Sequence, residues 1–346
     1  MAQYLNFHFD PELFLLNWKN TEDLTLTALY DSGAVQENAE IASLIANGGD
    51  FYTIPFYDVL GGGAPVNYDG ATNITATEHS GTAQTGVVYG RAQAWKARQF
   101  IRDFNSGADP MQSIAAQVAK YWQKWRQNNL LNILNGVFSV TDDNTDKWDA
   151  WQLHTTNLAT TGSSASAANR VTATTVGDAI QKAVGDNADV FSMAIMHSAV
   201  ANAFAKLDLL EYRKYTDANG IQRPLRIADI NGMAVIIDDG VPVKDSSSAN
   251  GEKEYTTYLF GTGAIQHANA PVSMPYEEKR DALVNGGEDY LITRMRETLH
   301  PNGFSYVLPS SGYTHSPTDE QLSAAANWRL VGDPKGIAMA RIITNG

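Results

Sequence analysis

The sequence predicts an α+β protein that combines one long helix, a long β-hairpin and a separate lobe of mixed helices and strands. Apolar residues recur at intervals of three and four between Asp109 and Gly136, which is the spacing of one helix face. Residues 51–100 contain two segments rich in aromatic and β-branched residues on either side of a Gly- and Thr-rich stretch, a pattern typical of a hairpin. From Thr174 onward, short helical and strand patterns alternate, as in an α/β lobe.

The composition bounds the class of protein. The chain has 346 residues, of which 43% are hydrophobic and 18% charged, so we expect a folded protein with a large core in two packed lobes. It has no cysteine, which excludes disulfides, thiolate chemistry and Cys-ligated metal sites. The formal charge of −13 argues against a sequence-specific DNA reader, which normally carries a basic face. We expect no membrane segment and no signal peptide, and therefore synthesis in the cytoplasm.

The long helix has clear predicted ends. Asp109 is a good N-cap, Pro110 suits the first helical position, and Gly136 is a plausible stop. At ~1.5 Å per residue such a helix is roughly 39 Å long, so we expect a strut that crosses the molecule. Its apolar face is predicted to comprise Met111, Ile114, Ala115, Val118, Trp122, Trp125, Asn129 and Ile133.

The segments before the helix have little core of their own. Residues 1–50 read as an irregular arm with a short helix around 37–46. The two strands predicted within 51–100 are joined by a polar tip that cannot bury enough surface to fold alone. A long hairpin with open edges is unusual in a monomer, so we expect it to clasp a neighbouring subunit.

The remainder of the chain is predicted as a polar connection followed by the α/β lobe. Residues 139–170 are read as that connection, because they are polar and partly of low complexity. Helices are predicted at 175–184, at 198–210 opened by Ser198, and at 318–328 capped by Thr318. Strands are predicted at 190–196, 225–228, 233–237, 255–268, 290–301 and 336–344.

Charge is distributed unevenly along the first third of the chain. Between Asn20 and Gly90 there is no Lys or Arg, whereas seven basic residues face two acids between Arg91 and Arg126. This reversal suggests that the acidic segment lies against the basic one, within or between subunits, with chance clustering of solvated charges as an equal alternative. The predicted subunit-interface residues are Asp50, Asp58, Asp69, Glu78, Arg91, Lys96, Arg98 and Arg102.

No motif supports an enzyme, a cofactor or a metal site. Gly261-Thr262-Gly263 lacks the third glycine and the helix of a dinucleotide fingerprint. The spacing of Asp142, Asn144 and Asp146 is that of a calcium loop, but the glycine and the glutamate that the loop requires are absent. The pair His197-Ser198 follows an apolar strand, yet a helix cap explains it more simply than a catalytic nucleophile. Trp122 and Trp125 are expected in the core.

Several segments resemble the major capsid (coat) proteins of tailed bacteriophages. The most specific are the DPMQSIA…YW start of the long helix and the pair VIIDDGVPV and YLFGTGAI. Further similarity lies in FYTIPFYDVLGG, RAQAWKARQFIRDFNSGA, AIMHSAVANAFAKLDLL, ITRMRETLHPNGFSY and ANWRLVGDPKGIAMARIITNG. The resemblance spans most of the chain from Phe51 onward.

This resemblance implies a Hong Kong 97-like capsid fold with an N-arm, an E-loop hairpin, a P-domain around a spine helix, and an α/β A-domain. The implied divisions are the N-terminal arm 1–50, the E-loop 51–100, the P-domain 101–149 with spine helix 109–136, the A-domain 150–270, the P-domain return strands 271–302 and the C-terminal part of the A-domain 303–346.

The resemblance also implies a function. Subunits made in the host bacterial cytoplasm would form hexameric and pentameric capsomers of an icosahedral shell, in contact with a portal protein and, non-specifically, with packaged double-stranded DNA. The chain starts too close to the arm for a fused scaffolding domain, so we expect a separate scaffolding protein or none. No Lys occurs between Asn20 and Gly90, so the part of the hairpin before β-strand residues 91–100 has no lysine for the E-loop crosslink found in some relatives.

Three other classes remain as alternatives. An encapsulin-type nanocompartment shares the fold but packages enzymes. A soluble α/β hydrolase would use His197 and Ser198, and its activity would be lost on Ser198→Ala. A decoration or tail-tube protein would form rings or tubes instead of closed shells.

Overall fold

The computed structural model describes most of the chain from Gly33 onward. The described residues are 33–57, 64–74, 76, 78, 81–98, 110–140, 146–160, 165–207, 209, 211–216, 222–230, 232–245, 252–309, 311–312 and 315–346. The predictions for the arm before Gly33, for the interface residues Asp58 and Arg102 and for the N-cap Asp109 fall outside this set.

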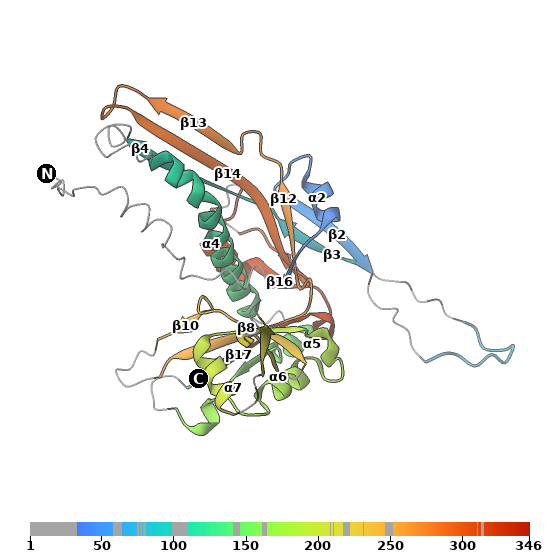
Figure 1. The fold of residues 1–346 in the computed structure, drawn as a ribbon. Coiled ribbons are helices and arrows are strands. Elements are labelled where there is room, and N and C mark those ends of the chain that lie inside the picture. Colours follow the sequence, from blue (N-terminus) through green and yellow to red (C-terminus); the bar gives the residue numbers. More distant parts are fainter. Residues whose placement is uncertain are drawn as a thin grey trace.

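A long helix connects two parts of the molecule. This helix, α4 (Pro110–Phe138), runs from an extended sheet at one end into a compact lobe at the other (Figure 1). A hairpin of β2 (Phe51–Tyr57) and β3 (Gly81–Val87) projects from the side of the sheet. The predicted combination of strut, hairpin and α/β lobe is therefore present.

The extended sheet is built around one strand, β14 (Glu288–Pro301). Antiparallel β4 (Tyr89–Arg98) pairs along one edge of β14. Along the other edge β14 pairs first with β13 (Tyr276–Asp281) and then with β12 (Ile265–Ala270), both antiparallel. Strand β1 (Val35–Glu37) adds to β12 in parallel, so the end of the arm completes this sheet.

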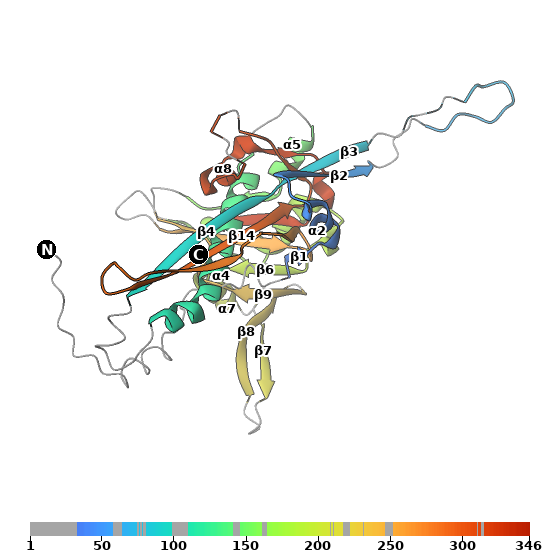
Figure 2. The ribbon, with the colours of Figure 1, turned by 90° about the horizontal axis from the view of Figure 1, so that it is seen from above.

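The compact lobe contains a second sheet in the order β5-β17-β11-β6-β9-β8-β7, with β10 paired to β11. Helices α6 (Thr175–Val184) and α7 (Ser198–Lys206) pack their apolar sides on it. The hairpin of β7 and β8 extends away from the body (Figure 2). The strands are β5 (Thr155–Asn157), β6 (Met193–Met196), β7 (Glu211–Thr216), β8 (Gln222–Ile230), β9 (Met233–Ile237), β10 (Val243–Lys244), β11 (Glu254–Phe260) and β17 (Met339–Thr344).

Smaller elements close the structure. They are α2 (Ala39–Ile45), α5 (Asp146–Gln152), α8 (Asp319–Ser323), the pair β15 (Phe304–Tyr306) and β16 (Trp328–Leu330), and the 3-10 turns Ala167–Asn169, Ala188–Val190, Ala325–Asn327 and Pro334–Gly336. Helix α2 packs on β12 and on the base of the hairpin in a small core of its own.

The principal core surrounds the second half of α4. Leu130, Ile133, Leu134 and Val137 are completely buried there, against side chains of both sheets and of the β15–β16 pair. The predicted apolar face is confirmed at Ile133, while Trp125 is only partly buried. Because one core includes residues of both sheets, α4 holds the two parts of the molecule together.

The predicted end of the long helix was wrong. The helix passes through Gly136 and ends at Phe138. A Cβ at Gly136 would lie 2.6 Å from both the carbonyl oxygen of Leu322 and Nε1 of Trp328. The glycine is therefore needed for the close approach of the 322–328 segment, and a helix stop is not its role.

Two other predictions were also incomplete. The second predicted hairpin strand divides at Val88, and only β3 pairs with β2, whereas β4 pairs with β14. The predicted polar connection 139–170 contains α5 and β5. Helix α5 is stabilised because Trp151 is buried against Phe138 and Phe304. The sequence around Trp151 is polar, so its pattern did not indicate this burial.

Several elements predicted after Thr174 are confirmed, but the strand predicted at 255–268 divides into β11 of the lobe and β12 of the extended sheet, and the helices predicted at 198–210 and 318–328 end at Lys206 and Ser323. Helix α6 and strand β9 have the predicted bounds. Thr318 caps α8, with its hydroxyl accepting from the Gln321 backbone N–H at 3.2 Å. These elements were predictable because short-range capping and periodicity determine them.

Candidate assembly surfaces

The hairpin of β2 and β3 is anchored at its base by a buried tyrosine. Tyr52 Oη lies 2.9 Å from Thr298 Oγ1. The Thr298 hydroxyl donates to the carbonyl of Val87 at 2.8 Å. Burial raises the pKa of Tyr52 above its ordinary value, so the phenol stays neutral. Gly86 leaves room for the ring, since a Cβ there would lie 2.2 Å from Tyr52.

Strand β3 is also fixed to the turn that follows β14. The Gln84 side-chain oxygen lies 2.9 Å from His300 Nε2 and accepts from the Gly303 N–H at 3.3 Å. The Thr85 N–H donates to Ser305 Oγ at 3.1 Å. Burial lowers the pKa of His300 to about 4, so the ring is neutral near pH 7 and its Nε2 carries the proton that Gln84 accepts. The hairpin is therefore held at a defined angle.

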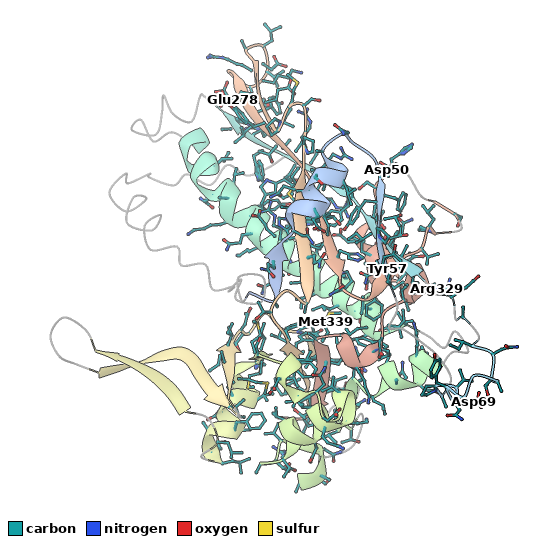
Figure 3. All side chains as sticks on the ribbon, turned by 90° about the vertical axis from the view of Figure 1, so that its right-hand side faces the viewer. Asp50, Tyr57, Asp69, Glu278, Arg329 and Met339 are labelled. Atoms are coloured by element: carbon teal, nitrogen blue, oxygen red, sulfur yellow. The ribbon has the colours of Figure 1, made fainter. Side chains whose placement is uncertain are left out.

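Beyond this base the hairpin stands away from the rest of the molecule. Asp50, Tyr57 and Asp69 follow one another outward along it (Figure 3), and the segment that contains Asp69 projects well beyond the body in Figures 1 and 2. The acidic side chains of Asp69 and Glu78 are exposed on this segment. Asp50, in contrast, lies at the base, with Oδ2 2.6 Å from Nδ1 of His315.

Three of the predicted basic residues, Arg91, Lys96 and Arg98, lie on β4 and have carboxylate partners in the same chain. Arg91 is 2.6 Å from Asp319 and also donates to the Pro317 carbonyl at 2.8 Å. Lys96 Nζ and Arg98 Nε lie 3.5 and 3.6 Å from the same oxygen of Glu288. These three cations thus lie on one strand, and each of them has a carboxylate partner within the same subunit.

Glu288 is a residue that the sequence prediction missed. Its side chain is 1% exposed and accepts hydrogen bonds from Tyr290 Oη at 2.5 Å and Asn285 Nδ2 at 2.7 Å. These two bonds, with a smaller contribution from Lys96, lower the pKa of Glu288 to about 2. Only strand pairing brings it to β4, so no local pattern could have indicated it.

A second buried carboxylate, Glu297, ties α4 to the sheet. Its Oε2 accepts from Arg126 Nε at 2.8 Å, and its Oε1 accepts from Tyr89 Oη at 3.3 Å. His267 Nε2 lies 3.5 Å from the same carboxylate, whose side chain is completely buried. Four elements, α4, β4, β12 and β14, therefore meet at one side chain.

The lobe is joined to α4 by a further polar contact. Gln127 Nε2 donates to Asp238 Oδ2 at 3.0 Å, and the other oxygen of this buried carboxylate accepts from the Gly240 N–H at 2.8 Å. The Asp238 side chain is completely buried. Its burial shows that it orients the lobe on the helix.

The motifs considered for catalysis or metal binding have structural roles. His197, not Ser198, is the N-cap of α7, and its Nδ1 accepts from the Ala199 N–H at 3.1 Å. Gly261-Thr262-Gly263 leads into a strand instead of a helix. Of the calcium-loop residues, Asp142 and Asn144 lie outside the described residues, and Asp146 begins α5. Within the described ranges no cluster of three or more His, Asp or Glu side chains could hold a metal ion.

No helix among the described residues is long and apolar enough to cross a membrane.

The comparisons with known proteins agree with this geometry. The major capsid protein of Bacillus phage SPP1 is 32% identical over 333 residues, which cover 96% of this chain and 94% of that protein. The capsid of Ralstonia phage GP4 has a similar fold, with a TM-score of 0.54 at 12% identity over 90% of this chain and 87% of that one. No family model matches the chain.

A solved encapsulin has a comparable fold. The holo-SrpI encapsulin complex from Synechococcus elongatus PCC 7942 gives a TM-score of 0.50 at 10% identity and covers 93% of this chain and 88% of that one. The fold alone therefore defines a class, the α+β shell proteins of Hong Kong 97-like architecture, without separating capsids from encapsulins. Sequence identity separates them: the chain belongs to the family of tailed-bacteriophage major capsid proteins. It is a structural subunit of the icosahedral virion shell and not an enzyme.

Proposed function

We propose that the subunits of this shell are held together by the hairpin, which lies across β4 and α4 of an adjacent copy. The observation that carries the proposal is the contrast between the two ends of the hairpin. Its base is fixed by buried hydrogen bonds of Tyr52, Gln84 and Thr85, whereas the segment around Asp69 projects from the body (Figure 2). A rigidly aimed arm of this kind suits a contact with another subunit, because little conformational entropy is lost on docking.

In this proposal the domains keep their predicted limits, except that β4 at the end of 51–100 belongs to the extended sheet that the neighbour's hairpin contacts. Residues 51–100 act as the E-loop, 101–149 and 271–302 as the P-domain, and 150–270 with 303–346 as the A-domain, after an N-terminal arm of residues 1–50. The proposed capsomers are hexameric and pentameric, and the closed shell holds double-stranded DNA through non-specific contacts. A portal protein and a separate scaffolding protein are further proposed partners.

Charge supports the placement of the hairpin only in part. Asp69 and Glu78 are exposed acids on the projecting segment, and the Lys96 side chain on β4 is 55% exposed. Arg91 is less suitable, because it is 20% exposed and held by Asp319. Of the proposed cations on β4, Lys96 is therefore the one best placed to meet an acid of a neighbour while still near Glu288.

The test is assembly of the full chain, expressed alone and with its neighbouring genes, followed by negative-stain microscopy and light scattering. We expect closed shells tens of nanometres across from the wild type. Replacement of residues 64–78 by a short Gly-Ser link should abolish shells and leave the melting temperature of the subunit unchanged. Normal shells from this variant would refute the hairpin contact, and a wild type that stays monomeric under every condition would refute the assembly proposal.

A further inference from the structure

The projecting segment of the hairpin contains a small ordered turn. The Asp69 carboxylate accepts from the backbone N–H groups of Ala71 and Thr72 at 2.9 and 2.7 Å, from Thr72 Oγ1 at 2.9 Å and from Asn67 Nδ2 at 3.4 Å. Gly70, at φ +73°, supplies the left-handed conformation that the turn requires. The turn is therefore formed by local hydrogen bonds and needs no packing against the body.

The ionised carboxylate is an integral part of this turn. The backbone hydrogen bonds from Ala71 and Thr72, followed by the Thr72 hydroxyl, lower the pKa of Asp69 to about 2. The Asp69 carboxylate is therefore ionised at neutral pH and available as the acceptor of the turn.

The same turn presents large apolar side chains to solvent. Tyr68 is 94% exposed, Ile74 76% and Val66 48%. A single exposed apolar residue is ordinary, but three within so short a segment on a projecting arm indicate a contact surface. A Tyr side chain has only two χ angles to fix on binding, so it loses little conformational entropy, a property typical of aromatic anchors at interfaces.

We propose that residues 66–74 form a docking knuckle that inserts the Tyr68 ring into an apolar site on a second copy of this chain, with Asp69 facing a cation at the rim of that site. This inference rests on the proposed function, because it specifies the anchor of the hairpin contact.

Two observations favour a second copy as the occupant. Residues 58–80 separate the two strands, and half of such a segment reaches about 35 Å when extended at ~3.3 Å per residue, far enough to cross onto a neighbouring subunit. The chain also offers the complementary charge. No Lys or Arg occurs between Asn20 and Gly90, whereas Lys96 on β4 and Lys120 on α4 are exposed. A different protein that decorates the shell is the other occupant that the experiment can detect.

The experiment measures assembly rate and the critical concentration for assembly of the purified full chain by light scattering. Tyr68→Ala should raise the critical concentration at least about tenfold, and the matched control Tyr68→Phe, which keeps the ring, should stay within about twofold. Asp69→Ala, which removes the acceptor of the turn, should resemble Tyr68→Ala. Because these side chains are exposed, the melting temperature of each subunit should not change.

The absence of cysteine permits a direct identification of the partner. Ala71→Cys, labelled with a photocrosslinker, is assembled from a mixture of isotopically light and heavy copies. Crosslinks between light and heavy peptides support the proposal. Assembly of Tyr68→Ala at the wild-type rate, or crosslinks only to another protein, would overturn it. Failure of the wild type to form shells would instead refute the proposed function, so the two failures are distinguishable.

Discussion

At the scale of single residues, two buried carboxylates on β14 join neighbouring elements: Glu297 joins the long helix to the extended sheet, and Glu288 joins β14 to β4. Glu297 collects contacts from Arg126, Tyr89 and His267, and Glu288 collects Lys96 and Arg98 at the far end of the same strand. A buried ion pair adds little net stability over an apolar pair, but removal of one partner leaves a desolvated charge and is costly. These residues therefore determine how the elements are joined.

The substitution Glu297→Ala tests how much the buried carboxylate at the long helix contributes to stability. Because Arg126 would lose its carboxylate in a nearly closed site, we expect the free energy of unfolding to fall by about 2–3 kcal/mol, below the full range for buried pairs since Arg126 remains 28% exposed. Urea unfolding of the unassembled subunit measures it. The control is Glu252→Ala at the solvated Arg170–Glu252 pair, which is 49% and 32% exposed and should cost less than about 1 kcal/mol. Equal losses would contradict the role assigned to Glu297.

The Glu288 carboxylate is expected to make the stability of the subunit depend on pH. Its pKa of about 2 in the folded chain lies below the unfolded value near 4.3, so its stabilisation is complete above that value and is lost as the pH falls toward 2. The difference in unfolding midpoint between wild type and Glu288→Gln should be constant from pH 5 to 7 and should shrink below pH 4. A difference that does not vary with pH would show that the ionised carboxylate has no such role.

At the scale of elements, the long helix shows how packing overrides local preference. Glycine destabilises a helix interior by up to about 1 kcal/mol relative to alanine, yet Gly136 lies inside α4, where the 322–328 segment approaches too closely for a Cβ. Gly177 in α6 has nothing within 4 Å of the position that a Cβ would occupy. The two glycines should therefore respond to substitution in opposite directions.

We expect Gly177→Ala to stabilise the subunit by about 0.5–1 kcal/mol through helix propensity. Gly136→Ala should instead destabilise it by about 1–3 kcal/mol, because the clash with Leu322 and Trp328 outweighs the same gain. Thermal unfolding of both variants against wild type provides the comparison. If Gly136→Ala also stabilised the subunit, the close approach would not be the reason for this glycine.

At the scale of the whole molecule, the two parts are expected to unfold together. Leu134 of α4, Phe260 of β11 and Leu299 of β14 belong to one buried cluster, so the sheet and the lobe share a core. Calorimetry of the unassembled subunit should show a single transition. Leu134→Ala should lower its free energy of unfolding by about 2–5 kcal/mol without splitting it. Two separate transitions would show that the sheet and the lobe are independent units.

Local patterns in the sequence were sufficient for the helices and strands that depend on neighbouring residues. The bounds of α6, the cap of α8 by Thr318 and the apolar face of α4 at Ile133 all follow from spacing and capping within a few residues. The resemblance of sequence motifs from Phe51 onward led to the correct family, which the 32% identity to the SPP1 capsid protein confirms. The α+β capsid fold that it implied is confirmed by the similarity to the capsid of Ralstonia phage GP4, while its division into domains remains a prediction. The interface predicted from the charge reversal remains a prediction.

Only the tertiary structure decided which long-range partners each residue has. Glu288 lies beside Lys96 across 192 positions of sequence, and Arg91 meets Asp319 across 228. These cations thus have carboxylate partners within the subunit, which the sequence did not indicate, while their contact with a neighbouring subunit stays a prediction. The structure also showed that Gly136 continues the helix and that α5 is folded around Trp151. The physical reason is the same in each case: burial and strand pairing join segments whose local sequences carry no signal of one another.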